Sequence, residues 1–183
     1  ERTADAAQSI VDTCIKANVL LGVVFQHRFR AASETLTKLI KQRTLGEIRM
    51  VRAEIPWWRD QSYYDEPGRG SYARDGGGVL ISQAIHTLDL MLSLTGPVSS
   101  VQAICATTPL HQMEAEDFAT GGMIFESGAV GSIFASTASF PGDTESLTFE
   151  CDKASALLKS GVLTVHWREG QVETFGEKAS TGG

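Results

Sequence analysis

The chain has few of the features that mark several common classes of protein. Its 183 residues include only three cysteines, Cys14, Cys105 and Cys151, which lie far apart and form no C-x-x-C pair. This pattern indicates neither a zinc site nor a redox motif, and it is typical of reduced core thiols in a cytoplasm. No apolar run approaches the roughly 20 residues of a membrane span, and no signal-peptide layout opens the chain. We therefore expect a soluble, cytoplasmic protein.

Positive charge is also scarce. Sixteen lysines and arginines face 22 acidic residues, which gives a formal net charge of −6 and a pI near 5.2. Nucleic acids and anionic membranes are bound by clustered basic side chains, so we expect neither as a partner and look for a small molecule or a protein. His111 and His166 have no cysteine or carboxylate at ligand spacing. We predict surface or pairing roles for both histidines, and no metal.

The first 58 residues alternate between helical and strand patterns. Thr3 and Asn18 are suited to begin and end a helix, and the β-branched run after it, residues 19–26, is typical of a strand buried in a parallel sheet. Residues 31–46 have the pattern of a second helix that closes on Gly46. Residues 47–58 alternate as a half-exposed antiparallel strand does. A helix that leads directly into a buried strand resembles the last unit of a βαβ domain.

Short strand patterns then dominate the chain. Turn signals separate seven of them, at residues 98–108, 115–127, 129–139, 145–152, 154–160, 162–169 and 171–177. Because neighbours in sequence usually pair, a meander of antiparallel strands is the simplest arrangement. The predicted fold class is α+β, with helices on one face of a mostly antiparallel sheet.

One apolar segment of helical length carries an unexpected set of polar residues. It follows three glycines at residues 76–78, and Ser82, His86, Asp89 and Ser93 recur at intervals of four, three and four, which predicts one polar stripe. A neutral histidine near a helix N-terminus can pass a proton at neutral pH, and Asp89 is placed to fix its tautomer. The alternative is a flexible glycine turn, with the histidine and the aspartate satisfying each other.

A long loop precedes this helix and is rich in aromatic and arginine side chains. Flat aromatic faces stack on sugar or uracil rings, and arginine forks bind diphosphate, so the loop suits a sugar nucleotide. The alternative is that the aromatic residues only pin the loop to the sheet. The residues concerned are Trp57, Trp58, Arg59, Tyr63, Tyr64, Arg69 and Tyr72.

The segment "GGGVLISQAIHTLD" resembles the G-G-G-x-L-x-[DN]-x-G-x-H-x-x-D motif of the Gfo/Idh/MocA family of NAD(P)-dependent oxidoreductases. The "HRF" at residues 27–29 is similar to a strand-end motif of that family. Within the family, "YYDEPGRGSYARDGGG" and Gln83 look most like the branch that acts on UDP-linked amino sugars, the UDP-N-acetyl-sugar 3-dehydrogenase type. The resemblance implies an enzyme that oxidises a secondary hydroxyl of a sugar, a sugar nucleotide or a polyol.

The resemblance also implies roles for individual residues. His86 matches the active-site histidine that assists proton transfer at the substrate hydroxyl. Ser82 stands where the family has Asp or Asn, and Ala84 where it commonly has Gly. A serine hydroxyl can hydrogen-bond a substrate oxygen, but it cannot act as a carboxylate base. Arg28 follows the predicted buried strand, where it would contact the cofactor or form a salt bridge. The predicted substrate-binding residues are Trp58, Arg59, Tyr63, Tyr64, Arg69, Tyr72, Gln83 and Asp89.

Two parts of the family's machinery are missing from the sequence. There is no G-x-G-x-x-G fingerprint between a strand and a helix, and no E-K-P motif with its catalytic lysine. We therefore expect residues 1–29 to be the remnant of a Rossmann domain. Residues 30–183 would be a substrate-binding and oligomerisation domain, truncated at its C-terminal end and inactive alone. NAD or NADP would serve the full-length protein but not bind this fragment.

Two further expectations concern assembly and the chief alternative. Family resemblance implies a homodimer or homotetramer that forms through the face of the sheet. The competing hypothesis is a non-catalytic sugar-binding or oligomerisation module derived from the family, which the serine at position 82 favours.

Overall fold

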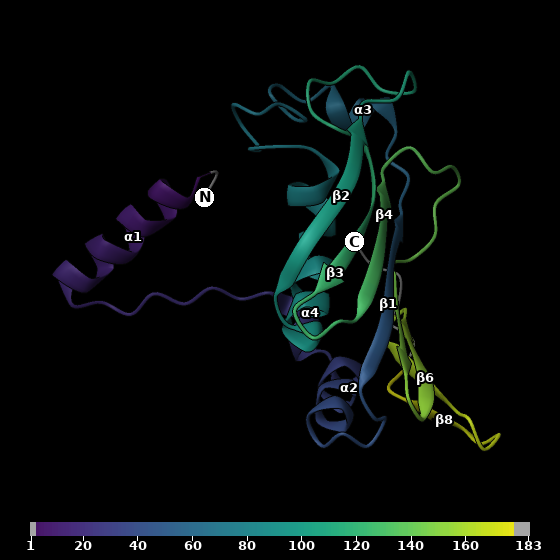
Figure 1. Cartoon of the computed structure of the whole chain (residues 1–183). Coiled ribbons are helices and arrows are strands. Elements are labelled where there is room, and N and C mark those ends of the chain that lie inside the picture. Colours follow the sequence, from purple (N-terminus) through teal and green to yellow (C-terminus); the bar gives the residue numbers. More distant parts are fainter. Residues whose placement is uncertain (1–2, 178–183) are drawn as a thin grey trace.

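The computed structural model describes residues 3–177, which form one eight-stranded sheet with helices on one of its faces (Figure 1). Along the sheet the strand order is β2-β3-β4-β1-β5-β6-β7-β8. The strands are β1 (Ile48–Pro56), β2 (Val98–Ala106), β3 (Phe118–Phe125), β4 (Val130–Ser136), β5 (Ser146–Cys151), β6 (Ala154–Lys159), β7 (Val162–Trp167) and β8 (Val172–Phe175). The predicted α+β class is confirmed.

All seven strands predicted after residue 97 are present, but they do not form one meander. β1 lies between β4 and β5, parallel to β4 and antiparallel to β5. The predicted antiparallel pairing of β1 is therefore confirmed on its β5 side, whereas the parallel pairing with β4 was not predicted. Its alternating pattern correctly places Val51, Ala53 and Ile55 in the core, where none of them is exposed, but alternation reports which face is buried and not which strands are neighbours.

Two helices cover the inner face of the sheet. α2 (Ala31–Lys41) packs on β6, β7 and β8, and α4 (Ile85–Thr95) packs on β1 and β5. Leu36 of α2 and Leu90 and Met91 of α4 are buried with Phe149 of β5 in a single core. Two short helices, η1 (Gln26–Phe29) and α3 (Gln61–Tyr64), lie in the connections. No helix within residues 3–177 is long and apolar enough to cross a membrane.

Helix α1 (Ala4–Ala17) begins and ends as predicted. The Thr3 side chain accepts a hydrogen bond from the Ala6 amide, and Asn18 closes the helix in the left-handed conformation with φ of +53°. The following residues, 19–25, are not the predicted strand: they run extended but pair with no strand of the described chain, and Leu20 is fully exposed. In Figure 1, α1 stands apart from the sheet at the end of this segment.

The three cysteines are all free, but only one of them is a core residue. Cys151 is buried, whereas Cys14 is half-buried and Cys105 is exposed on β2. Burial raises the pKa of the Cys151 thiol to about 11, so this thiol is unreactive at neutral pH. The expectation of core thiols is therefore wrong for Cys14 and Cys105.

Candidate active site

The glycine-led helix begins with a wide turn, η2 (Leu80–Ala84), which has π-helical hydrogen bonding and runs straight into α4. The glycines before it are not a flexible spacer. A Cβ atom on Gly78 would lie 1.8 Å from the backbone oxygen of Glu116. The carboxylate of Glu116 accepts hydrogen bonds from the amides of Gly78 (3.0 Å) and Leu80 (3.2 Å). Glu116 therefore caps the helix, which requires glycine at position 78.

Gln83 and His86 present buried polar atoms that lack hydrogen-bond partners. The Gln83 side chain is buried, and neither its amide nitrogen nor its amide oxygen bonds to any described residue. The same holds for Nδ1 of the half-buried His86. Nearby Ser82 is exposed, and its hydroxyl donates to the carbonyl oxygen of Gly78 at 2.6 Å. Buried polar groups are rarely left unpaired, so this helix start is suited to a polar ligand or to water.

His86 lies beside a second, buried histidine. Its ring contacts those of His27 and Phe25, with centroid separations of 5.4 and 6.0 Å. Burial, helped by the nearby Arg30 cation, lowers the pKa of His27 to about 4. His27 is therefore neutral at physiological pH, and its ring adds no positive charge that would oppose protonation of His86.

Asp89 does not serve His86 in either of the ways considered above. Both of its carboxylate oxygens accept from the Arg28 guanidinium, at 2.5 and 2.6 Å, and this bidentate pair ties η1 to α4. Donation of these hydrogen bonds to Asp89 raises the pKa of Arg28. Arg28 thus makes the salt bridge that was one of its two predicted roles, and its contact with a cofactor stays a prediction.

The structure brings together three of the predicted loop residues. The guanidinium carbon of Arg59 lies 5.4 Å from the Tyr63 ring centroid, and that of Arg69 lies 4.1 Å from it. Arg59 also lies 5.3 Å from the ring centroid of Trp57. Its Nε atom is buried and has no partner among the described residues. Two guanidinium groups close to one tyrosine ring form a site that fits an anionic, ring-bearing ligand.

The other predicted loop residues do not contact the two guanidinium groups in this way. Tyr64 is buried, its hydroxyl is hydrogen-bonded to Thr137 at 2.6 Å, and burial raises its pKa. Trp58 packs against the rings of His111 and Phe140. These two aromatic residues pin the loop, as the alternative interpretation predicted. Tyr72 is exposed.

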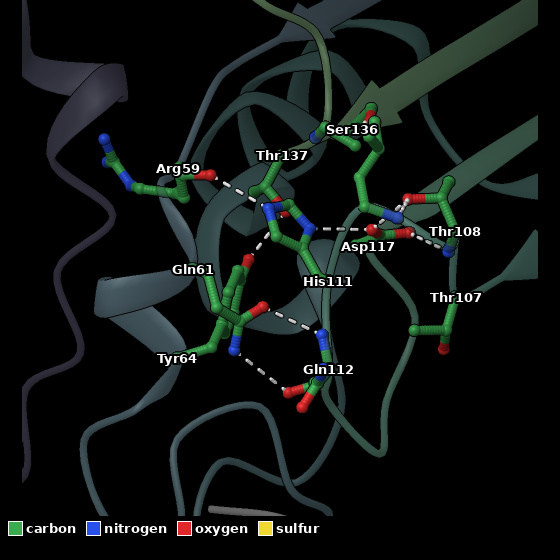
Figure 2. A network of polar contacts seen from close by, with 12 residues as sticks. Arg59, Gln61, Tyr64, Thr107, Thr108, His111, Gln112, Asp117, Ser136 and Thr137 are labelled. Atoms are coloured by element: carbon green, nitrogen blue, oxygen red, sulfur yellow. Dashed lines mark hydrogen bonds and ion pairs between the residues drawn. The ribbon is translucent and has the colours of Figure 1, made fainter.

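Figure 2 shows a buried polar network that the sequence did not reveal. Nδ1 of His111 lies 2.7 Å from the Asp117 carboxylate, and Nε2 lies 2.9 Å from the carbonyl oxygen of Arg59. The pairing role predicted for His111 is confirmed, but the surface position is wrong. Arg59 and His111 are 52 residues apart in sequence, so no local pattern could signal their contact.

The comparisons with known proteins agree with this architecture. Residues 33–157, more than half of the chain, match the pattern of the GFO/IDH/MocA C-terminal domain. None of the curated sequences compared with the chain matches it.

Solved structures provide similar relatives. The WlbA dehydrogenase from Bordetella pertussis, in complex with NADH and UDP-GlcNAcA, is 34% identical with a TM-score of 0.82, over 87% of this chain and 46% of that one. The WlbA enzyme from Chromobacterium violaceum, with the same two ligands, is 33% identical with a TM-score of 0.80, over 87% and 46%. Levoglucosan dehydrogenase with NADH shares the fold at 22% identity and a TM-score of 0.78, over 96% and 52%. The chain spans about half the length of these proteins, and it belongs to the Gfo/Idh/MocA family, whose C-terminal domain it contains.

Proposed function

We propose that this chain is the substrate-binding part of an NAD(P)-dependent dehydrogenase that oxidises a secondary hydroxyl of a UDP-linked amino sugar. The observation that carries the proposal is the set of buried, unpartnered polar atoms on Gln83 and His86 at the start of the glycine-led helix. A hydroxylated ligand supplies both donors and acceptors to such atoms. The two WlbA dehydrogenases, crystallised with UDP-GlcNAcA, are the relatives that suggest the ligand class.

His86 is the proposed acceptor of the proton that the substrate hydroxyl loses. General acid-base catalysis at neutral pH favours a histidine that is neutral before the reaction and becomes charged during it. The neutral His27 ring beside it and the nearby carboxylate of Asp89, already paired with Arg28, leave the local charge balanced. In this arrangement His27 adds no positive charge, and His86 can accept a proton.

Arg59 and Arg69 are the proposed contacts for the diphosphate, and the Tyr63 ring, which both guanidinium groups approach, is the proposed stacking surface. Arg59 makes no salt bridge with a described carboxylate, whereas Arg69 pairs with Glu66. A diphosphate would therefore give Arg59 its first ionic partner. Since the ligand supplies bidentate acceptors, the planar guanidinium suits it better than a lysine would.

NAD or NADP is the proposed cofactor, because the dehydrogenases of similar fold are crystallised with NADH. The described residues do not fit a dinucleotide. Within residues 3–177, the glycine-rich stretch at residues 68–78 forms turns that bond to Glu66, Glu114 and Glu116. It follows no strand that could begin a nucleotide-binding unit. We therefore assign only substrate binding and proton handling to this part of the chain.

We also propose that the chain self-associates through the open face of the sheet. The strand register places Met50, Ile124 and Val130 in one row on the face without helices, and Ile104 and Phe134 in another. Four of these five side chains are at least 41% exposed. Apolar rows of this kind on a folded domain are typical of a protein interface.

Binding of UDP-GlcNAcA, followed by tryptophan fluorescence, tests the proposed substrate class. Trp57 and Trp58 lie in the loop, so saturable quenching is expected for the wild-type chain. Arg59→Ala should weaken binding at least about tenfold, equivalent to about 1.4 kcal/mol, because a bidentate phosphate contact is lost. His166→Gln, an exposed change on β7, should leave the affinity unchanged. Absence of saturation, or equal affinity for Arg59→Ala, would contradict the assignment.

One observation favours a second function, a sugar-nucleotide-binding module without catalysis. The Ser82 hydroxyl donates to the Gly78 carbonyl and cannot replace a carboxylate. The reading frame before the codon for Glu1 discriminates between the two functions. A G-x-G-x-x-G unit that ends in E-K-P there supports the dehydrogenase, and reduction of NAD⁺ or NADP⁺ by that longer protein with UDP-GlcNAcA would demonstrate it. An unrelated segment supports the module.

A further inference from the structure

The ring of His111 is hydrogen-bonded through both nitrogens inside the protein. Neither His111 nor Asp117 exposes any side-chain surface. Nδ1 faces a carboxylate oxygen of Asp117 and Nε2 faces the carbonyl oxygen of Arg59 (Figure 2). A carbonyl oxygen only accepts, and so does a carboxyl oxygen of Asp117 in its ionised form. Two hydrogen bonds at 2.7 and 2.9 Å therefore require a proton on each ring nitrogen of His111.

The charges around the ring support this state. Asp117 also accepts from the amide and the hydroxyl of Thr108, at 2.7 and 2.6 Å, which favours its carboxylate form. A carboxylate with no exposed surface is costly to bury unless a cation neutralises it, and His111 is the cation within hydrogen-bond reach. Asp60, which caps α3, and Tyr64, whose ring lies 4.8 Å from that of His111, supply no positive charge. The loop's other ionisable side chains are Arg59, Tyr63 and Asp65, and the β2–β3 connection also carries Glu114 and Glu116. Arg59 is the one cation among them, and its guanidinium lies against the rings of Trp57 and Tyr63 and forms no ion pair with Asp117.

This pair connects two loops that are distant in sequence. His111 and Asp117 belong to the connection between β2 and β3, and Arg59 lies in the loop after β1. A second link runs beside it, because the amide of Gln112 donates to the side chain of Gln61 at 2.8 Å. The bond to the Arg59 carbonyl fixes the backbone from which the Arg59 side chain extends toward the Tyr63 ring.

We propose that His111 is a positioning residue for the sugar-nucleotide site. It is a buried imidazolium that pairs with Asp117 and, through its second N–H, holds Arg59 in place for the ligand. Its role in ligand binding rests on the function proposed above, whereas its protonation and its bond to Arg59 do not. The two can therefore fail separately.

The protonation is tested on the wild-type chain, without any substitution. In a chain labelled with ¹⁵N-histidine, His111 should show two ring N–H signals in NMR spectra at neutral pH, because burial protects both from exchange. Asp117→Asn should reduce them to one, since an amide oxygen no longer favours the charged ring. A single ring N–H on wild-type His111 would overturn the proposal.

The positioning role is tested with His111→Gln, which keeps one donor and removes the charge, and with His166→Gln as the exposed control. Both are compared at a temperature where circular dichroism shows them folded. We expect His111→Gln to bind UDP-GlcNAcA about tenfold more weakly, while His166→Gln binds as the wild type does. Wild-type affinity in folded His111→Gln would make the residue merely structural and refute its positioning role.

A wild-type chain that binds no UDP-GlcNAcA would have a different consequence. It would refute the proposed function, while the amide chemical shifts of residues 59–64 in His111→Gln would still report whether the histidine holds this loop. Unchanged chemical shifts at residues 59–64 would also refute the proposal that His111 holds Arg59 in place.

Discussion

Acid should destabilise this domain through His27. The side chain is almost fully enclosed, and the groups that face it are Arg30 and His86, which oppose its protonation, and Glu145 and Asp89, which favour it. Burial dominates and holds its pKa at about 4, compared with 6.5 for an unperturbed histidine. The unfolded chain therefore binds a proton more readily than the folded one. The free energy of unfolding has its full value above about pH 6.5 and falls as the pH decreases toward 4.

The size of the effect follows from the two pKa values. Relative to neutral pH, His27 alone should lower the free energy of unfolding by about 2 kcal/mol at pH 5 and by about 3 kcal/mol at pH 4. Urea denaturation of the wild type and of His27→Gln, repeated at each pH, measures it. Carboxylates whose pKa is lowered by ion pairs, such as Asp143 and Asp152, affect both proteins equally and cancel in the difference. A difference between the two proteins that stays constant from pH 7.5 to pH 4 would refute the reasoning.

Two further changes test the helix start and the open face of the sheet. Gly78→Ala forces a Cβ to within 1.8 Å of the Glu116 backbone and should destabilise the fold by about 3 kcal/mol or more in urea. Gly122→Ala, whose Cβ would meet nothing closer than 3.9 Å, should change stability by about 0.5 kcal/mol at most, and equal midpoints for the two variants would contradict the packing argument. In light scattering, the wild-type chain should have the mass of a dimer or tetramer, and Ile104→Asp should shift it toward monomer. A monomeric wild type would contradict the proposed interface.

Local features of this fold could be predicted from the sequence. Thr3 and Asn18 begin and end α1 where expected, because capping depends on side chains within a few residues of the helix end. The seven later strands follow from turn residues and alternation in the same way. The central place of β1, parallel to β4, could not be predicted, because pairing across about 80 residues leaves no mark on a local pattern.

The candidate site, too, could be predicted from the sequence only in its local features. The family-like spacing identified His86 and the helix that carries it. The residues that surround this helix are distant from it in sequence. Arg28, which pairs with Asp89, is 61 residues away along the chain, and His27 is separated from His86 by a similar number of residues. Glu116, which caps the helix, lies in the connection between β2 and β3. Charge and spacing on one helix suggested Asp89 as the partner of His86, but a guanidinium offers a carboxylate a stronger, bidentate bond than an imidazole does.

The segment at residues 19–25 shows that a correct pattern can still predict the wrong structure. Its β-branched residues are apolar on both faces, which indicates burial from two sides, yet Val19, Val23 and Val24 are more than half exposed. A strand forms only where a neighbour supplies backbone donors and acceptors, and the described chain supplies none here. The assignment of residues 1–29 to a separate nucleotide-binding domain stays a prediction.

The wide turn η2 connects local backbone geometry with the proposed chemistry. A regular helix with 3.6 residues per turn would predict only which side chains share a face. The structure instead inserts a π-helical turn at Leu80–Ala84, in which the Gln83 amide is buried without a partner one turn before His86. An unpaired buried amide lowers stability, and apolar packing would avoid that cost. A helix start that keeps both the irregular turn and the polar side chain gains no stability from them, and the proposed ligand-binding role accounts for both.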